Sequence, residues 1–268
     1  MSNFDFLLEQ KDFESFAPIA VRAEKYAHDD PDTSIGLCRK AAECATNWLY
    51  AVDRHLDSTG LRDFRDKISN YQFKKLVGAD ICDSVHLIRK LGNKAVHGEN
   101  ANFPPKTSLV IVYSLFKYLC WIEHNYVSSD TFRRFSSVFV PGFGKSQSSP
   151  ITTQNGASLN TKEEAERKEI RILVSSDEDD PVITYSDEKL EKLNQNKEQS
   201  KDKPLKVSSD ISEEFTRKLY IDTLLNEVGW FEGKNMTAMC QVTCDKFFFL
   251  FSKRGPGGKL FFPLCLAD

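Results

Sequence analysis

The chain has 268 residues, of which 40% are hydrophobic and 12% aromatic, so it can bury at least one large core. Its formal net charge of −3 gives no overall attraction to nucleic acid, and such binding would need a local basic surface. The longest apolar runs fall far short of the roughly 18–20 residues of a membrane span, and residues 1–10 lack the features of a secretion signal. The seven cysteines are odd in number and lack paired spacing, which suits a reducing compartment. Together with the missing membrane span and secretion signal, this predicts a cytoplasmic protein with no membrane partner.

Residues 1–126 show apolar side chains at every third or fourth position, which is typical of packed helices. Asp30 before Pro31 marks the start of one such helix, and Pro104-Pro105 marks another. The predicted helices span residues 13–27, 31–52, 61–68, 79–97 and 105–126. Because the loops between them are short, we expect a mainly α fold in which five helices pack as a bundle.

The rest of the chain divides at about residue 211. Residues 127–211 are mostly polar, with almost no aromatic side chains after residue 143, and we expect them to form a disordered linker with at most one short strand at Ile170–Val174. Residues 212–268 are apolar again, but this segment is short for an independent fold. It is therefore expected to be a small, incomplete C-terminal segment.

One face of the predicted helix 79–97 carries a line of polar side chains with the spacing 3, 4, 4. The line is formed by His86, Arg89, Asn93 and His97, with Lys90 and Lys94 beside it. Such a set is suited to nucleic-acid contact, or to metal-independent acid and base catalysis on RNA. A solvated helix face whose basic end interacts with the helix dipole has the same pattern, so both interpretations stay open.

The opposite face of the same helix is apolar and contains a glycine. Ile81, Val85, Ile88 and Leu91 fall on this face, and Gly92 lies among them. A glycine inside a helix costs about 1 kcal/mol relative to alanine. Its presence on the buried face therefore predicts the close approach of another helix.

The string from Ile88 to Gly98, together with Cys38-Arg39-Lys40-Ala41-Ala42-Glu43, resembles a HEPN-like domain of unknown function. That domain stands at the N-terminus of bacterial type I restriction subunits and related helicases. The resemblance covers about residues 1–126 and implies a role in antiviral defence by restriction-modification, with other restriction-modification subunits as partners. The parent enzymes are ATP-dependent, site-specific deoxyribonucleases.

Residues 212–230 resemble the first helix of the nuclease domain in the same restriction subunits. The expected continuation is missing, because no Glu-x-Lys triplet follows Trp230 and no Gly-x-x-x-x-Gly-Lys-Ser/Thr loop occurs anywhere. Cys240 and Cys244 have no second ligand pair nearby, so no metal or other cofactor is predicted. We expect a truncated or frame-shifted nuclease-like segment at 212–268, without motor or complete nuclease.

The resemblance also includes a catalytic branch of ribonucleases, whose motif is an arginine, a polar residue, three further residues and a histidine, usually completed across a dimer. Asn93 and His97 match the last two positions, but Gly92 stands where the arginine belongs. The first expectation is therefore a noncatalytic interaction or nucleic-acid-contact module. The alternatives are a metal-independent ribonuclease or toxin, in which Arg89, Asn93 and His97 are the catalytic residues, and a plain helical scaffold. A homodimer through this helix is among the expected partners.

Overall fold

The computed structural model describes residues 1–97, 101–127, 131–144, 169–170, 173, 184–227, 236–243, 246–255 and 258–265. These residues form two compact units, Met1–Ile211 and Ser212–Asp268. No helix among the described residues is long and apolar enough to cross a membrane.

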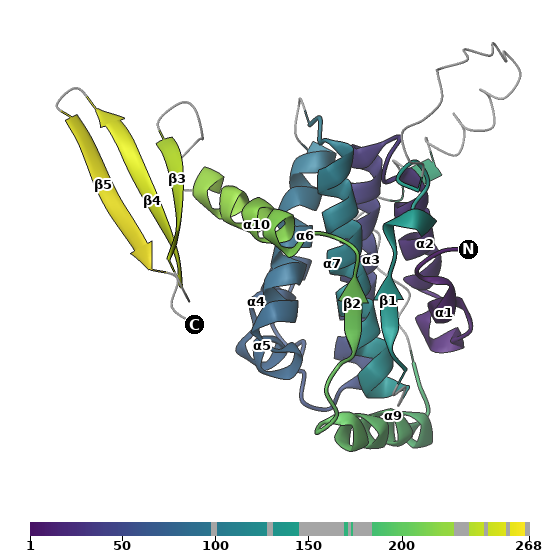
Figure 1. The fold of residues 1–268 in the computed structure, drawn as a ribbon. Coiled ribbons are helices and arrows are strands. Elements are labelled where there is room, and N and C mark those ends of the chain that lie inside the picture. The colour runs from purple at the N-terminus through teal and green to yellow at the C-terminus, as the bar shows by residue number, and fades with distance from the viewer. Residues whose placement is uncertain are drawn as a thin grey trace, which may run out of the picture. The chain divides into compact units, whose positions relative to one another are not determined.

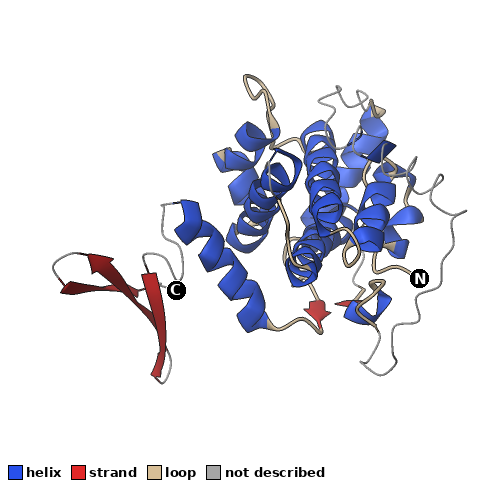
Figure 2. Cartoon of the chain, turned by 90° about the horizontal axis from the view of Figure 1, so that it is seen from above, coloured by secondary structure: helices blue, strands red, loops and turns tan. Residues whose placement is uncertain are grey.

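The first unit is almost entirely helical, as the sequence predicts (Figures 1 and 2). Its helices are α1 (Asp5–Leu8), α2 (Ala17–Tyr26), α3 (Pro31–Val52), α4 (Phe64–Ser69), α5 (Tyr71–Val77), α6 (Ala79–His97), α7 (Pro105–Tyr126) and α9 (Asp187–Ser200). Short 3-10 turns occur at Lys11–Phe13 and Ser137–Phe139, and two short strands are β1 (Arg133–Phe135) and β2 (Val207–Ser209).

Helices α3 and α7 form the centre of the bundle, and both begin where the sequence predicts. The Asp30 side chain caps α3 by accepting a hydrogen bond from the backbone N–H of Thr33 at 3.2 Å, and Pro31 occupies the first helical position. The α3 residue Trp48 is fully buried, with its ring edge-on to Phe13 and Tyr126. These aromatic contacts hold the N-terminal turns and the end of α7 against α3.

Two helical predictions differ from the structure at the level of single turns. The predicted helix 13–27 is a 3-10 turn at Lys11–Phe13 followed by α2, and Phe13 and Phe16, three residues apart, are both buried although the chain between them is not a regular helix. Helix α5 was not predicted. It begins at Asn70, whose side chain accepts from the backbone N–H of Gln72, and it buries only Phe73 and Val77. Two apolar positions are too few to show a helical period in a sequence.

The prediction of a disordered linker over residues 127–211 is wrong for residues 131–144, which contain β1 and the 3-10 turn at Ser137–Phe139, and for residues 184–211. Residues 187–200 form α9, which packs on α7 and α3 across one end of the bundle (Figure 1). Strand β2 then pairs in parallel with β1, with Arg133 opposite Val207 and Phe135 opposite Ser209. Of the predicted strand at Ile170–Val174 only Ile170 and Leu173 are described, and both are helical.

We call residues 184–211 the returning segment, and its contacts explain why a polar sequence becomes ordered. Tyr185 accepts a hydrogen bond from the indole N–H of Trp48 at 2.9 Å, and Lys189 pairs with Asp12 at 2.6 Å. Leu193 is 4% exposed, so α9 also buries an apolar side chain against the bundle. Hydrogen bonds and ion pairs to the bundle therefore replace the apolar periodicity that a sequence pattern would show.

The second unit contains α10 (Glu213–Glu227) and an antiparallel sheet in the order β3 (Met236–Thr243), β4 (Lys246–Gly255), β5 (Gly258–Cys265). The predicted helix beginning at 212 is α10. The closing apolar run, which shows no clear pattern in the sequence, supplies β4 and β5, with Phe251 opposite Ala238 on one side and Phe262 on the other. Glu232, Asp245 and Asp268, the acidic residues after Trp230, lie outside the described residues.

Replacement of Leu193 by alanine tests whether the returning segment belongs to the fold. We expect the free energy of unfolding to fall by about 2–5 kcal/mol, because a buried leucine is removed from the contact of α9 with the bundle. Chemical denaturation measures this loss, and Glu191→Ala at an exposed position of α9 is the matched control. Equal stability of the two variants would show that α9 does not contribute to the core.

Candidate functional site: a polar seam between α3 and α6

Helix α3 has a single side that is not buried. Between Ser34 and Tyr50, every residue is buried except Arg39, Glu43, Asn47 and Tyr50. Their spacing of 4, 4 and 3 places them in one stripe along the helix. This stripe is where α3 can meet a ligand.

The predicted polar line of α6 forms a second stripe. Ile81, Val85, Ile88 and Leu91 are all less than 8% exposed, so the prediction that this face turns inward is confirmed. On the other side, His86, Arg89 and Asn93 are half-buried and His97 is exposed. Solvent exposure along this line of side chains is therefore greatest at His97, in the last turn of the helix.

Helices α3 and α6 are held together near both ends of these stripes. At one end, α4 contacts both helices, since the Lys67 ammonium donates to Asn47 of α3 at 2.6 Å and the Ile68 carbonyl accepts from the Cys82 thiol of α6 at 3.7 Å. At the other end, α3 and α6 approach closely at Gly92, where an added Cβ would lie only 3.0 Å from Cγ and Cδ of Arg39. The predicted close approach at Gly92 is confirmed, and its partner is Arg39.

We call the half-buried side chains of these two stripes the polar seam: Arg39, Glu43 and Asn47 of α3 with His86, Arg89 and Asn93 of α6. Two guanidinium groups share the seam with one carboxylate, and Glu43 lies 3.8 Å from a terminal nitrogen of Arg39. Burial lowers the pKa of His86, and the charges of Arg89 and Lys90 lower it further, which favours the neutral form of His86. The seam thus keeps a net positive charge supplied by arginine.

The seam also contains polar atoms with unused hydrogen-bonding capacity. Arg39 Nε and Asn93 Oδ1 are both buried, and neither has a hydrogen-bond partner among the described residues. A buried donor or acceptor without a partner costs about 1–3 kcal/mol. A bound molecule that forms hydrogen bonds with these atoms would recover this free energy.

The remaining predicted contact residues fall on different parts of α6. The Lys94 ammonium lies over the Phe103 ring, 5.6 Å from its centroid, and is directed toward the start of α7. Lys90 is half-buried beside the line, and His97 is exposed in the last turn. The structure therefore gathers His86, Arg89 and Asn93, and leaves Lys94 and His97 at the margin.

Arg39 is a member of the site that the sequence does not predict. Arg39 and Glu43 belong to a string that carries the family resemblance, but their spacing alone does not show which helix they face. Only the packing of Arg39 on Gly92 places it beside the α6 line. The signal that points to it is the glycine on the buried face, which requires a partner on a neighbouring helix.

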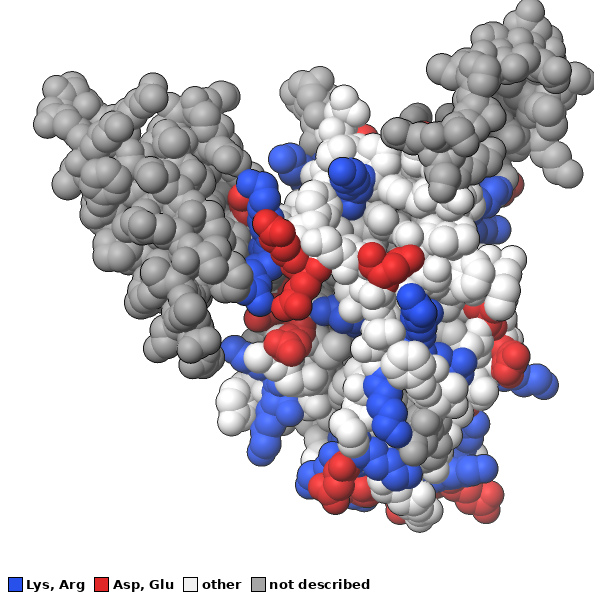
Figure 3. All heavy atoms as spheres, in the orientation of Figure 1, with Lys and Arg blue, Asp and Glu red and all other residues white. Residues whose placement is uncertain are grey.

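Charge elsewhere on the first unit is mixed. On the face shown in Figure 3, basic and acidic side chains of the described residues are interspersed and form no extended patch of one sign. Within the described residues, no group of three or more His, Cys, Asp and Glu side chains is arranged to hold a metal ion.

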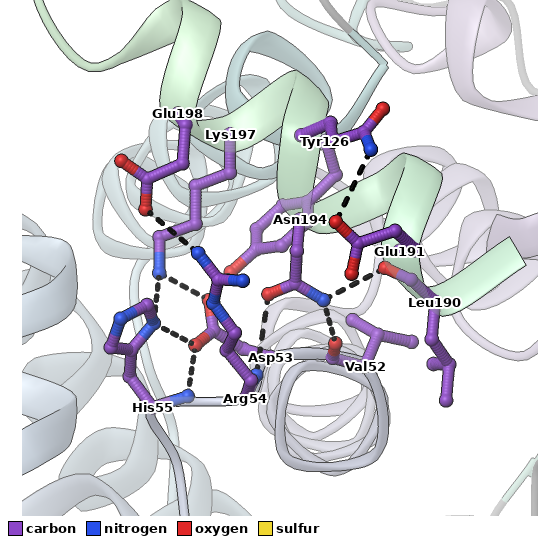
Figure 4. Close-up of polar contacts among 11 residues, drawn as sticks. Val52, Asp53, Arg54, His55, Tyr126, Leu190, Glu191, Asn194, Lys197 and Glu198 are labelled. Atoms are coloured by element: carbon purple, nitrogen blue, oxygen red, sulfur yellow. Dashed lines mark hydrogen bonds and ion pairs between the residues drawn. The ribbon is translucent and has the colours of Figure 1, made fainter. Parts of the chain in front are cut away.

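A second polar cluster, around Asp53 at the end of α3, holds α9 in place (Figure 4). The buried Asp53 carboxylate accepts hydrogen bonds from the Tyr126 hydroxyl and the Lys197 ammonium, both at 2.5 Å, and from the His55 backbone N–H at 2.8 Å. Asn194 of α9 donates to the carbonyl of Val52 at 2.9 Å. The carboxylate oxygens are occupied from several sides, so this cluster is structural rather than a ligand site.

The Asp53 carboxylate remains ionised inside the fold because of these donors. Burial by itself would raise the pKa of Asp53, but the hydrogen bonds from Lys197 and Tyr126 outweigh that effect and lower it below its ordinary value. A lowered pKa stabilises the folded state above the pKa of the unfolded chain, about 3.9. This contribution is lost as the pH falls through the pKa of the folded state.

Comparison with known proteins identifies one similarity. Residues 21–138 match the model of a protein family described as a domain of unknown function, DUF4145. The match begins within α2, ends in the 3-10 turn at Ser137–Phe139 and includes all residues of the polar seam, but it covers less than half of the chain. No curated protein and no solved structure matches the chain.

Removal of the Lys197 charge tests the Asp53 cluster. We expect Lys197→Met to lower the free energy of unfolding at pH 7 by about 3–5 kcal/mol, because a buried carboxylate loses its ionic partner. Unfolding measured from pH 7 down to pH 3 should show the difference from the unsubstituted protein shrinking, because Asp53 without Lys197 takes up a proton, and loses its uncompensated charge, at a higher pH than Asp53 in the unsubstituted protein. Lys201→Met, at an exposed position, is the control. A difference that is constant with pH would contradict the assignment.

Substitution of Gly92 tests the close approach of α3 and α6. Although alanine is favoured over glycine in helices by about 1 kcal/mol, we expect Gly92→Ala to be destabilising by about 1–3 kcal/mol, since its Cβ would overlap Arg39. Thermal unfolding compares it with Lys94→Ala at an exposed position of the same helix. Stabilisation by Gly92→Ala would mean that the helices do not touch there.

Proposed function

We propose that residues 1–211 form a noncatalytic nucleic-acid-contact module that binds backbone phosphates at the polar seam. The observation that carries this proposal is the packing of Arg39 on Gly92. It brings the side-chain stem of an arginine from α3 to the position where the ribonuclease motif would have an arginine on α6. Arginine is well suited to phosphate because its planar group donates several hydrogen bonds in a fixed geometry.

The same packing is the argument against catalysis. An arginine at position 92 could not be accommodated, because even a Cβ there would overlap Arg39. His97 is exposed in the last turn, one turn beyond Asn93 and outside the half-buried part of the line. A catalytic histidine must lie within hydrogen-bonding reach of the reacting groups, and the described residues of this chain give His97 no such partner in the seam.

The second candidate is a metal-independent ribonuclease. It is favoured by Asn93 and His97, which stand at the polar and histidine positions of the motif. In that case Arg89 or Arg39 would hold the scissile phosphate, and a second copy of the chain, joined through α6, would complete the site. The first candidate requires neither a dimer nor a titrating histidine.

The wider setting follows from the resemblance to type I restriction subunits. We place the module in a bacterial restriction-modification system directed against foreign DNA, where it would contact nucleic acid or other subunits of the system. A cytoplasmic location is supported by Cys38, Cys44, Cys82 and Cys120, which are buried and free of disulfides. The family that matches residues 21–138 has no described function and neither favours nor opposes this setting.

Binding and cleavage assays with labelled single-stranded RNA and DNA test the two candidates. We expect the unsubstituted protein to bind without cleaving, and Arg89→Gln to weaken binding about tenfold or more, as loss of a hydrogen bond to a charged group does. Arg134→Gln, at an exposed position on β1, is the matched control. RNA cleavage that persists with a chelator and disappears in His97→Ala would establish the ribonuclease instead. Absence of both binding and cleavage would leave only a helical scaffold.

A further inference from the structure

Helix α9 is attached to the bundle mainly by polar contacts. Of its 14 residues only Leu190 and Leu193 are apolar, and only Leu193 is buried. Burial of apolar surface therefore contributes little to the attachment, which depends on hydrogen bonds and on the ion pairs made by Lys189 and Lys197. An element held in this way can separate from a bundle whose core remains intact.

His55 lies beside the ion pair that holds the C-terminal half of α9 (Figure 4). Its ring atom Nδ1 is 3.2 Å from Asp53 Oδ1 and also 3.2 Å from the Lys197 ammonium nitrogen. One ring nitrogen either donates or accepts a hydrogen bond, and an ammonium group only donates, so the contact with Lys197 requires that Nδ1 accepts. The His55 side chain is 54% exposed and can therefore exchange protons with solvent.

Protonation of His55 changes its contact with Lys197 from attractive to repulsive. A protonated imidazole carries hydrogen on both ring nitrogens, so Nδ1 then donates to Asp53 and no longer accepts from Lys197. Two cations then lie 3.2 Å apart and compete for one carboxylate. Release of α9 removes Lys197 and leaves Asp53 to the imidazolium. Proton uptake by His55 and release of α9 therefore favour each other.

The other titratable and charged groups around His55 do not cancel this effect. Burial alone would raise the pKa of Asp53, but the hydrogen bonds that it accepts lower it below its ordinary value, so the carboxylate stays ionised in mild acid. On α7, burial raises the pKa of Tyr126, and its hydroxyl stays neutral. Arg54 and Glu198 pair with each other at 3.6 Å and contribute one charge of each sign.

From this geometry we infer that His55 is a pH switch that detaches α9 from the bundle in mild acid. At neutral pH the imidazole accepts from Lys197, and α9 is docked on α3 and α7. As the pH falls to about 5–6, where histidine takes up a proton in known pH switches, Lys197 leaves Asp53 and the hydrogen bond from Asn194 to the Val52 carbonyl is lost with it. The switch does not involve the polar seam, so it holds whether or not the seam binds nucleic acid.

Hydrogen exchange of the α9 backbone amides, measured by mass spectrometry on the full chain at pH 8 and pH 5.5, tests this inference. At each pH the exchange of residues 187–200 is compared with that of the unfolded chain, which removes the intrinsic pH dependence of the exchange reaction. We expect the protection of α9 to be about tenfold lower at pH 5.5, because one proton is taken up on release. Helices α3 and α7 should remain protected at both pH values.

Substitutions of the two histidines that contact the returning segment show which of them is responsible. His55→Gln can still accept from Lys197 but cannot take up a proton, so the protection of α9 should be equal at both pH values. His124→Gln is the matched control, because His124 Nε2 lies 3.1 Å from the Lys203 carbonyl. This variant should keep the tenfold loss.

Thermal unfolding at pH 8 establishes that each variant folds, and His55→Ala, which also removes Nδ1, decides the question if His55→Gln does not fold. Protection of α9 that does not depend on pH in the unsubstituted protein would overturn the inference. A loss in His55→Gln equal to that of the unsubstituted protein would overturn it as well. So would loss of protection in all helices together at pH 5.5, because the bundle would then unfold as one unit.

Discussion

The close approach of α3 and α6 at Gly92 is the contact on which the candidate site depends. A side chain at this position would separate the helices, since Arg39 occupies the space that a Cβ would need. The same contact has two consequences: it buries the apolar face of α6, and it brings the side-chain stem of an arginine from α3 to the polar line of α6. Packing and function are therefore linked at one residue, and a substitution there is expected to affect both.

The returning segment gives the bundle a different kind of stabilisation. Its contacts are mostly polar, and they converge on the end of α3, where Asp53 receives donors from α7 and α9 (Figure 4). The interactions of a buried carboxylate with charged and neutral donors are costly to break, because removal of a charged partner leaves a buried charge uncompensated. The folded unit consequently extends to residue 211, well beyond the end of the family match at residue 138.

The sequence predicts those parts of the structure that are set by local periodicity and capping. Helices α3, α6 and α7 start and end close to the predicted positions, because each has a long apolar face and α3 and α7 have proline in the first turn. The returning segment could not be predicted in this way, since its order comes from pairs such as Lys189 with Asp12, which are far apart in the chain. For the same reason the sequence locates Arg89 and Asn93 on one line but does not identify Arg39 as their neighbour.

Observation of the Arg39 Nε–H group during binding tests the central claim most directly. In a nuclear magnetic resonance titration of the full chain with a single-stranded oligonucleotide, the Nε–H signal of Arg39, assigned by comparison with Arg39→Lys, should shift progressively and reach saturation together with binding. Arginine signals remote from the seam, such as that of Arg134, should remain in place. Binding that leaves the Arg39 signal unchanged would contradict the account, because the phosphate would then be held elsewhere.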